Sequence, residues 1–492
     1  MRRYDEIVVG AGVNGLIAAT RLAMAGHNVL LVDQASHVGG RSYGHRFHEG
    51  FSSPGLLSDT SGLRPQVLHE LGLTLKRAPQ RRAPVTLTPE GLRPVDAEAW
   101  QRWQRWIDSV APVIGDFLDD PPLDLLHPER VPLRQLADRG WELRKLGRNK
   151  MRELFRVPPM SAADWLEEWF EHPADRAAIA AEALAGSWLA PRSPGGAFSV
   201  LLQRVADSGA ILGGTTALID ALNLQARRAG VSFQLDSKVA RLRIDGDAVR
   251  GVEFVDGESV ASSKVLSTVA PNRTMLDWLP VALLPYPVRR RYEAWRCRGT
   301  TAQLLLALSQ PPSQLATADG PTEFTQTALH PDDIERAFDA VKYRQRSERP
   351  VLLVQNASAS CPQLAPAGQA VLSVLIHYAP HDLEGGWTDE SCEALRDATV
   401  ELLEERLPGL RASIVAEQLL DPHEIERRYG LPGGQIHHGE QALDQLLIRP
   451  EPEALHYRTV VDGLWLGGSG SHPGGSLTGA PGRLASAAML FN

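Results

Sequence analysis

Residues 7–41 read IVVGAGVNGLIAATRLAMAGHNVLLVDQASHVGGR, and this stretch decides the fold class. An apolar run is followed by a glycine-rich turn, a helix-like segment and a second apolar run that ends at Asp33. In this pattern Gly10 makes the tight turn, Gly12 lets backbone approach a pyrophosphate, and Gly15 lets helix and strand pack closely. The first N–H groups of the helix would face the phosphates, and Asp33 would accept hydrogen bonds from a ribose. The order of elements therefore predicts a dinucleotide site rather than a purely structural turn.

The residues after Asp33 bear on which dinucleotide is bound. Five positions separate the acid from Gly39, Gly40 and Arg41. This spacing resembles flavoproteins of the glutathione-reductase type, in which the nucleotide is FAD. The two glycines would let backbone lie close to the cofactor, and Arg41 could pair with its phosphates. Such flavoproteins more often carry Glu at the position of Asp33, so the acid alone leaves NAD open.

A second glycine-rich loop lies near the C-terminus. Residues 463–483 read GLWLGGSGSHPGGSLTGAPGR, which predicts a strand, a loop with six glycines and the start of a helix. Such a loop lets a flat cofactor lie against backbone, and the helix N-terminus would stabilise negative charge on a reduced flavin ring. We expect the two glycine-rich ends of the chain to hold one cofactor, in preference to the alternative of a mobile surface loop.

Nearly the whole chain resembles the phytoene-desaturase-like flavoproteins, within the glutathione-reductase-type and amine-oxidase-like group. The most specific match is the C-terminal GSGSHPGGSLTGAPGR, and residues 431–446 resemble the family's H-G-x-x-x-x-D-Q segment. The resemblance implies an α/β fold, in which a Rossmann FAD-binding domain of the glutathione-reductase type is interleaved with a mixed α+β substrate domain. It also implies noncovalent FAD in an extended pose. The implied contacts are Gly10, Gly12, Gly15, Asp33, Gly39, Gly40 and Arg41 at the ADP half, the backbone of Val239 at the adenine, and Gly468, Gly470, Gly475, Leu477 and Thr478 near the ring.

The chain changes character several times along its length, which predicts five segments. The stretch after the first unit is rich in Trp, Arg and Pro, whereas Asp245-Gly246 and Asp256-Gly257 punctuate alternating runs and predict a three-stranded meander. The FAD-binding domain is expected from residues 1–75, 210–299 and 456–492, and the substrate domain from residues 76–209 and 300–455.

Composition excludes several functional classes. A net charge of −8, from 51 basic and 59 acidic residues, argues against a nucleic-acid partner. The three cysteines, Cys297, Cys361 and Cys392, are far apart, so neither a metal site, a disulfide framework nor a redox dithiol is predicted. No apolar stretch approaches the roughly 20 residues of a membrane span, and the first strand follows Met1 closely, so no leader is expected. We expect a cytoplasmic protein.

Two histidines are the candidate catalytic side chains. His472 lies in the C-terminal loop and His438 in the His-Gly segment, and a histidine there could orient substrate or move a proton. A hydrogen-bonded structural role is the favoured alternative for each. His437 and Glu440 are weaker candidates.

Three tryptophans, Trp100, Trp103 and Trp106, recur at helical spacing. They could line an apolar substrate tunnel. Ordinary core packing is the favoured interpretation of such a stripe.

Residues 139–156 mix basic and apolar side chains, which predicts one basic amphipathic helix. Such a helix could lie on anionic lipid and give the protein a peripheral membrane contact. Because Glu142 and Glu153 dilute the charge, a solvated cap helix is the favoured interpretation.

The resemblance and the motifs together predict an FAD-dependent oxidoreductase that dehydrogenates, and so desaturates, a small apolar or amphipathic organic substrate by hydride transfer to flavin. Oxygen, a quinone or another acceptor would reoxidise the flavin. A flavin amine oxidase is the second possibility. A non-redox double-bond isomerase, or a cofactor-binding interaction protein without turnover, is the third. Residues 210–216 keep two glycines but lack the family's Tyr-Pro, which argues against transferring carotenoid specificity.

Overall fold

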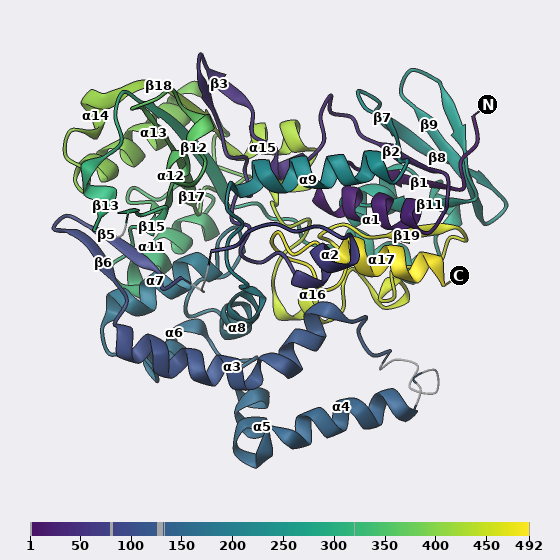
Figure 1. Ribbon diagram of the computed structural model, residues 1–492, viewed down its shortest axis with the longest axis horizontal. Coiled ribbons are helices and arrows are strands. Elements are labelled where there is room, and N and C mark those ends of the chain that lie inside the picture. The colour runs from purple at the N-terminus through teal and green to yellow at the C-terminus, as the bar shows by residue number, and fades with distance from the viewer. Residues whose placement is uncertain (1, 79–81, 125–130, 132, 319, 492) are drawn as a thin grey trace.

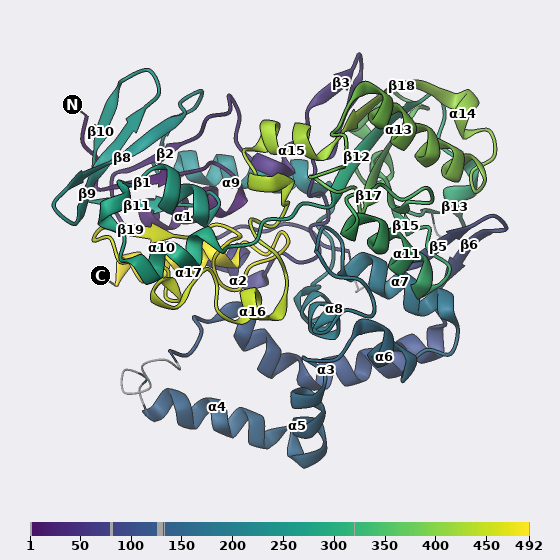
Figure 2. The ribbon, with the colours of Figure 1, turned by 180° about the vertical axis from the view of Figure 1, so that it is seen from behind.

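The computed structural model describes residues 2–78, 82–124, 131, 133–318 and 320–491. Two sheets lie at opposite ends of the molecule, and a layer of helices lies beneath them in the view of Figure 1. Both chain termini lie at the end that holds the first sheet (Figures 1 and 2). The candidate site lies between the two sheets.

The first sheet is entirely parallel, with five strands in the order β19-β11-β1-β2-β7. Its strands come from three separated stretches of chain, so the sheet forms only when distant segments meet. Its strands are short apolar runs, as expected for a parallel sheet covered on both faces. The strands are β1 (Glu6–Val9), β2 (Val29–Val32), β7 (Ser232–Gln234), β11 (Lys264–Ser267) and β19 (Leu464–Leu466).

Alternate side chains of β1 enter two different cores. Val8 packs with helices α1 (Val13–Met24), α9 (Gly214–Arg228) and α17 (Ala480–Leu490) on one face. Ile7 and Val9 pack on the other face with the antiparallel meander and with α10 (Tyr286–Glu293). This alternation follows from the two-residue period of a strand. The meander, which the two Asp-Gly turns predicted, consists of β8 (Val239–Asp245), β9 (Ala248–Phe254) and β10 (Ser259–Ala261).

The second sheet has seven strands in the order β18-β12-β17-β16-β15-β5-β6 and is antiparallel except between β15 and β5. Helix α13 (Asp389–Glu404) packs against one face of it, and α7 (Pro173–Ala183) and α11 (Pro331–Lys342) contact strands of it as well. A parallel Rossmann sheet joined to this mixed α+β part confirms the predicted fold class. The strands are β5 (Val85–Thr88), β6 (Gly91–Pro94), β12 (Thr301–Leu308), β15 (Phe324–Gln326), β16 (Val351–Asn356), β17 (Ala370–His377) and β18 (Ile414–Leu420).

The tryptophan stripe lies on α3 (Ala97–Asp119) and belongs to the core of the helical layer. Trp103 is fully buried, and its ring meets those of Trp165 and Phe170 at centroid distances of 5.6 and 5.5 Å. Helices α6 (Ala162–Glu167) and α8 (Gly196–Ala206) pack against α3 and against each other. The core interpretation of the stripe is therefore confirmed, and the tunnel interpretation is not supported.

The single basic helix predicted over residues 139–156 is wrong. The chain forms α4 (Leu133–Lys145) and α5 (Gly147–Arg156), which are separated at Leu146. Gly147 has a φ of +76°, a left-handed conformation that L side chains rarely adopt, and it turns the chain between the two helices. No helix among the described residues is both long and apolar enough to cross a membrane.

The remaining elements are short. They are α2 (Pro65–Glu70), α12 (Ala357–Ser360), α14 (Leu410–Ser413), α15 (Pro422–Tyr429), α16 (Leu443–Leu447), β3 (Arg46–His48), β4 (Phe51–Ser52), β13 (Ala316–Thr317) and β14 (Gly320–Pro321).

Candidate active site

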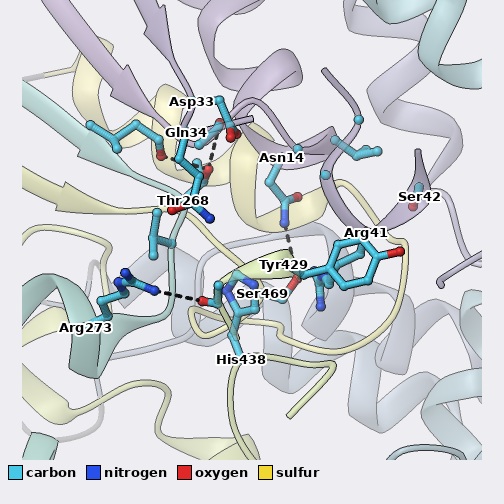
Figure 3. A pocket seen from close by; sticks show the side chains of 18 of the residues that line it. Asn14, Asp33, Gln34, Arg41, Ser42, Thr268, Arg273, Tyr429, His438 and Ser469 are labelled. Carbon is cyan, nitrogen blue, oxygen red and sulfur yellow. Dashed lines mark hydrogen bonds between the residues drawn. The ribbon is translucent and has the colours of Figure 1, made fainter. Parts of the chain in front are cut away.

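A cleft with an empty volume of about 990 Å³ opens where the strands of the first sheet end. This is the edge at which ligands bind in open parallel sheets. Figure 3 shows side chains from the beginning, the middle and the end of the chain gathered around it. The sequence-predicted residues that line it are Gly10, Gly12, Asp33, Gly39, Gly40, Arg41, Val239, His438 and Leu477.

The three glycines of the first turn are needed for different reasons. A Cβ at Gly15 would lie 1.7 Å from the carbonyl oxygen of Gly10, so the start of α1 packs directly on the turn. Gly10 itself has a φ of +101°, and a Cβ there would meet the Thr268 hydroxyl at 2.4 Å. At Gly12, by contrast, an added Cβ would meet only the Gly40 Cα, at 4.0 Å, and the φ of −68° suits any residue. Protein packing therefore does not explain Gly12, whereas a ligand in the cleft does.

Asp33 is fixed at the end of β2 by two backbone donors. The N–H of Ala11 donates to one carboxylate oxygen at 2.6 Å and the N–H of Ala35 donates to the other at 2.8 Å. Burial raises the pKa of Asp33 above its ordinary value, although both N–H groups act to lower it. Each oxygen keeps a lone pair free, because a carboxylate has about four acceptor sites, so it can still accept from a ribose hydroxyl.

The second glycine pair lies on the first turn. Gly39 donates its N–H to the Ala11 carbonyl at 2.8 Å, and a Cβ at Gly40 would lie 3.0 Å from the Gly12 Cα. Both have positive φ values, of +109° and +56°. The chain thus brings Arg41 to the floor of the cleft next to the first glycine turn.

Arg41 is a cation without an acidic partner. Its guanidinium donates to the Ile436 carbonyl and, at 2.7 Å, to the Ser469 hydroxyl. Burial alone lowers the pKa of Arg41, to about 10, and no acidic side chain in the described part of the chain forms an ion pair with it. A desolvated charge is costly unless it is paired, so this site requires an anion. A diphosphate fits that requirement.

The two ends of the chain are joined at the cleft. The Asn14 amide donates to the Ser469 hydroxyl at 3.4 Å and also accepts from the Gly482 N–H at 3.4 Å (Figure 3). Gly482 itself has no room for a side chain, because a Cβ there would lie 2.2 Å from the Asn14 carbonyl oxygen. The beginning of α1 and the beginning of α17 therefore flank the same cleft, as the sequence predicts.

Some C-terminal glycines lie in close contact with other protein atoms, whereas others line a cavity. A Cβ at Gly468 would lie 2.4 Å from the Thr268 carbonyl, and one at Gly470 would lie 2.3 Å from the Pro271 ring. Neither residue lines the cleft or the cavity beside it. Their close approach to protein atoms explains why glycine is needed at both. Gly475, Leu477 and Thr478 instead line the second cavity.

That second cavity adjoins the cleft, with which it shares Ser476 and Leu477, and has an empty volume of about 1470 Å³. One wall comes from strands β15, β16 and β17 of the second sheet and another from α8. Nine of the side chains around it are large and aliphatic. These are Leu56, Leu57, Leu118, Leu202, Leu353, Leu375, Ile436, Leu446 and Leu477, and the charged side chains are Asp59, Arg82 and Glu182.

The three histidines considered from the sequence lie in three different environments. His438 lines the cleft, where burial and then the charges of Arg41 and Arg449 lower its pKa well below the ordinary value. His472 is fully buried, with its ring 4.7 Å from that of Phe117, and lines neither cavity. His437, the weaker candidate, lines the second cavity. Of the three histidines, His437 alone lines the second cavity, whereas His438 lines the cleft and His472 lines neither.

His437 is held in one tautomer. Its Nε2 lies 3.0 Å from the Ala185 carbonyl, which can only accept, so Nε2 carries the proton. Burial lowers the pKa of His437 to about 4, and its Nδ1 has no partner among the described residues. A neutral imidazole with a free acceptor nitrogen can take a proton from a molecule in the cavity.

Arg449 was not predicted from the sequence, whereas Glu440 was a weaker candidate. The buried Arg449 guanidinium donates to the carbonyls of Ser469, His437 and Glu440 at 2.9–3.1 Å, and so ties the His-Gly segment to the C-terminal loop. The Glu440 carboxylate accepts from Arg296 and Arg298. These contacts make Glu440 a structural anchor, and neither cavity is lined by it. No sequence motif marks Arg449, because its partners are backbone groups brought together by the fold.

Comparisons with known proteins agree with this geometry. The chain matches the family of flavin containing amine oxidoreductases over residues 14–487, and it belongs to that family. It is 30% identical to pyridine nucleotide-disulfide oxidoreductase domain-containing protein 2 of Rattus norvegicus, over 98% of this chain and 92% of that protein. It is 25% identical to a lycopene-forming phytoene desaturase of a Paracoccus species, over 99% and 96% of the two chains.

Solved structures show the same fold. Putrescine oxidase bound to putrescine superposes with a TM-score of 0.62 at 17% identity, covering 100% of this chain and 99% of that one. An oxidoreductase from Methanosarcina mazei superposes with a TM-score of 0.59 at 16% identity, covering 99% and 100%. The predicted phytoene-desaturase-like resemblance is confirmed, and the protein is an FAD-dependent oxidoreductase.

Proposed function

We propose that the protein dehydrogenates an amphipathic organic molecule whose apolar body lies in the second cavity. The cavity supports this proposal, because it meets the cofactor cleft at Ser476 and Leu477 and nine leucine and isoleucine side chains form part of its wall. An apolar wall of this kind excludes water from a reacting C–H bond. When bound, FAD supplies the acceptor for a hydride.

The charged side chains of the cavity favour a substrate that also has a polar group. Glu182 is paired with the buried Arg204 at 2.8 Å and lies 3.9 Å from Arg82. Arg82 is the more exposed of the two arginines and keeps donors that these contacts do not use. A hydrogen-bonding group on the substrate would lie against Arg82, while the hydrocarbon contacts Leu353 and Leu375 on the floor.

The dehydrogenation removes a hydride and a proton from neighbouring atoms and leaves a double bond between them. Bound FAD would take up the hydride with its electron pair. His437 Nδ1 accepts the proton, because that nitrogen is unprotonated, has no partner among the described residues and belongs to a residue that lines the cavity. Oxygen, a quinone or another acceptor then takes up the two electrons and completes the cycle.

Anaerobic mixing of the yellow holoprotein with candidate substrates tests this proposal. Long-chain apolar and amphipathic compounds are compared with primary amines, and the visible flavin absorbance is followed together with the mass of the product. Bleaching by an apolar compound, with a product two hydrogens lighter, is the expected result. An isomerised product without bleaching would overturn the proposal in favour of an isomerase, and bleaching by amines alone would favour amine oxidation.

A cavity-filling variant locates the reaction. Leu375→Trp places an indole in the second cavity and is expected to abolish bleaching by substrate, while dithionite still reduces the flavin. Leu212→Trp is the matched control, because Leu212 is 55% exposed and lines neither cavity. Equal effects of the two substitutions would contradict the placement of the substrate.

A further inference from the structure

Helices α4 and α5, residues 133–156, form a projection that we name the basic arm. In Figure 1 and in the reverse view of Figure 2 it extends below α3, away from both sheets. It lines neither the cofactor cleft nor the second cavity. The proposed function therefore does not account for it.

The inner side of the arm is anchored to the body. Arg139 forms ion pairs with Asp116 and Asp120 at the end of α3. Leu154 is buried in the core of the helical layer, and Leu146 packs against that core. The arm is thus held in one position with one of its sides turned away from the protein.

The arm exposes three large apolar side chains. Leu133 is 84% exposed, Phe155 is 67% exposed and Trp141 is 58% exposed. Single exposed apolar residues are common on protein surfaces. Three of them lie on one short projection, and two of these are aromatic.

The same arm is strongly cationic. Residues 133–156 contain eight basic and three acidic side chains, a net charge of +5 in a chain whose total is −8. Acidic side chains of the arm form ion pairs within the arm. Glu142 pairs with Lys145 and Glu153 pairs with Arg156, each at 2.6 Å. Within the described ranges, the cations without an acidic partner are Arg144, Arg148, Lys150 and Arg152.

We propose that the basic arm docks the protein on an anionic lipid bilayer. Exposed Trp and Phe beside Lys and Arg is the composition of interfacial helices, whose rings enter the headgroup region while the cations meet lipid phosphates. Because the rest of the chain is negatively charged, the bilayer attracts the arm and repels the other faces, which fixes the orientation. The proposal takes the lipid-contact alternative in preference to the solvated cap helix that the sequence favoured.

Vesicle binding by the full-length holoprotein tests this inference. Co-sedimentation is measured with vesicles of phosphatidylcholine alone and of phosphatidylcholine mixed with phosphatidylglycerol, at low and at high salt. We expect binding to the anionic vesicles only, weakened when salt is raised to about 1 M, because the Debye length is then only about 3 Å. The double variants Trp141→Ser/Phe155→Ser and Arg148→Glu/Arg152→Glu should each reduce the bound fraction about tenfold.

Matched substitutions elsewhere on the surface serve as controls. Tyr286→Ser/Tyr343→Ser removes two exposed aromatic rings, and Arg46→Glu/Arg411→Glu reverses two exposed charges, all outside the arm. Both controls should bind vesicles as the unchanged protein does. Equal binding to neutral and anionic vesicles, equal losses in arm and control variants, or no binding at all would overturn the proposal. So would arm variants that change only the oligomeric state in light scattering, since that result would make the arm a protein interface.

Discussion

The Arg41 guanidinium donates to the Ser469 hydroxyl at 2.7 Å across 428 positions of the chain. This contact joins the first glycine-rich unit to the last and leaves the remaining donors of Arg41 facing the cleft. Because no acid in the described chain neutralises Arg41, the protein without cofactor holds a buried positive charge that the FAD diphosphate would compensate. We therefore expect cofactor binding and folding to be coupled at this residue.

Arg41→Met should have opposite effects on the two forms of the protein. Removing an unpaired buried charge should leave the apoprotein as stable as before, or more stable. The holoprotein should lose at least about 2 kcal/mol of FAD binding, the usual cost of losing a charged hydrogen-bonded partner. Thermal unfolding of both forms and titration with FAD measure these effects. Arg41→Lys is the control, because it keeps the positive charge but lacks the planar, forked donors of the guanidinium group. Unchanged FAD affinity in Arg41→Met would contradict the assignment of Arg41 to the FAD diphosphate.

Gly12 and Gly15 allow a sharp comparison within one turn. Gly12→Val should fold but fail to retain FAD, because its side chain enters space that the protein itself leaves empty. Gly15→Ala should instead reduce folding, since its Cβ would lie 1.7 Å from a carbonyl oxygen. Flavin stoichiometry and circular dichroism separate the two outcomes. Stoichiometric FAD in Gly12→Val would show that the pyrophosphate lies elsewhere.

His437 and His438 are neighbours in sequence but line different cavities. His438 has a φ of +60°, and its ring lines the cleft while the ring of His437 lines the second cavity. The proposed proton transfer therefore assigns different effects to the two histidines. Replacing each one by glutamine tests this assignment.

We expect His437→Gln to slow anaerobic flavin reduction by substrate about 100-fold or more, the usual contribution of a general base. FAD should stay bound. In the unchanged protein the same rate should fall as pH drops through about 4, because protonation then removes the acceptor lone pair of His437. His438→Gln should weaken FAD binding more than it slows reduction. A reduction rate unaffected by His437→Gln would exclude His437 as the proton acceptor.

The sequence predicted those parts of the site that are encoded locally. The glycine turn, Asp33 and the Gly39-Gly40-Arg41 step lie where expected because one short stretch specifies strand, turn and helix together. The roles of Gly468 and Gly470 depend on contacts with Thr268 and Pro271, so the motif could not separate packing from ligand contact.

Features that arise from tertiary contacts were not predictable in the same way. Arg449 binds carbonyls from two distant loops, and its surroundings exist only in the folded chain. The periodicity continues across Gly147 and so predicts one helix, whereas the φ of +76° at Gly147 divides the segment. Hydrophobic periodicity also could not show that Trp141 and Phe155 lack a covering partner.

Three buried histidines should make stability depend on pH. Burial lowers the pKa values of His377, His437 and His472 to about 4 each, from an ordinary value of about 6.5. Between these values the unfolded chain binds more protons than the folded one, so the free energy of unfolding falls as pH drops from about 6.5 to about 4. Above about pH 6.5 the neutral buried histidines no longer lower the free energy of unfolding.

Within this pH window, each of these histidines should change the free energy of unfolding by at most about 1.4 kcal/mol per pH unit. His377 lines neither cavity, so His377→Leu should leave the site unaffected. The substitution should reduce the pH dependence of the free energy of unfolding by the contribution of one histidine. Urea unfolding of the apoprotein at a series of pH values measures the slope, with His48→Leu, at an exposed histidine, as control. A slope that is identical in His377→Leu and the unchanged protein would show that His377 binds its proton equally well in the folded and unfolded states.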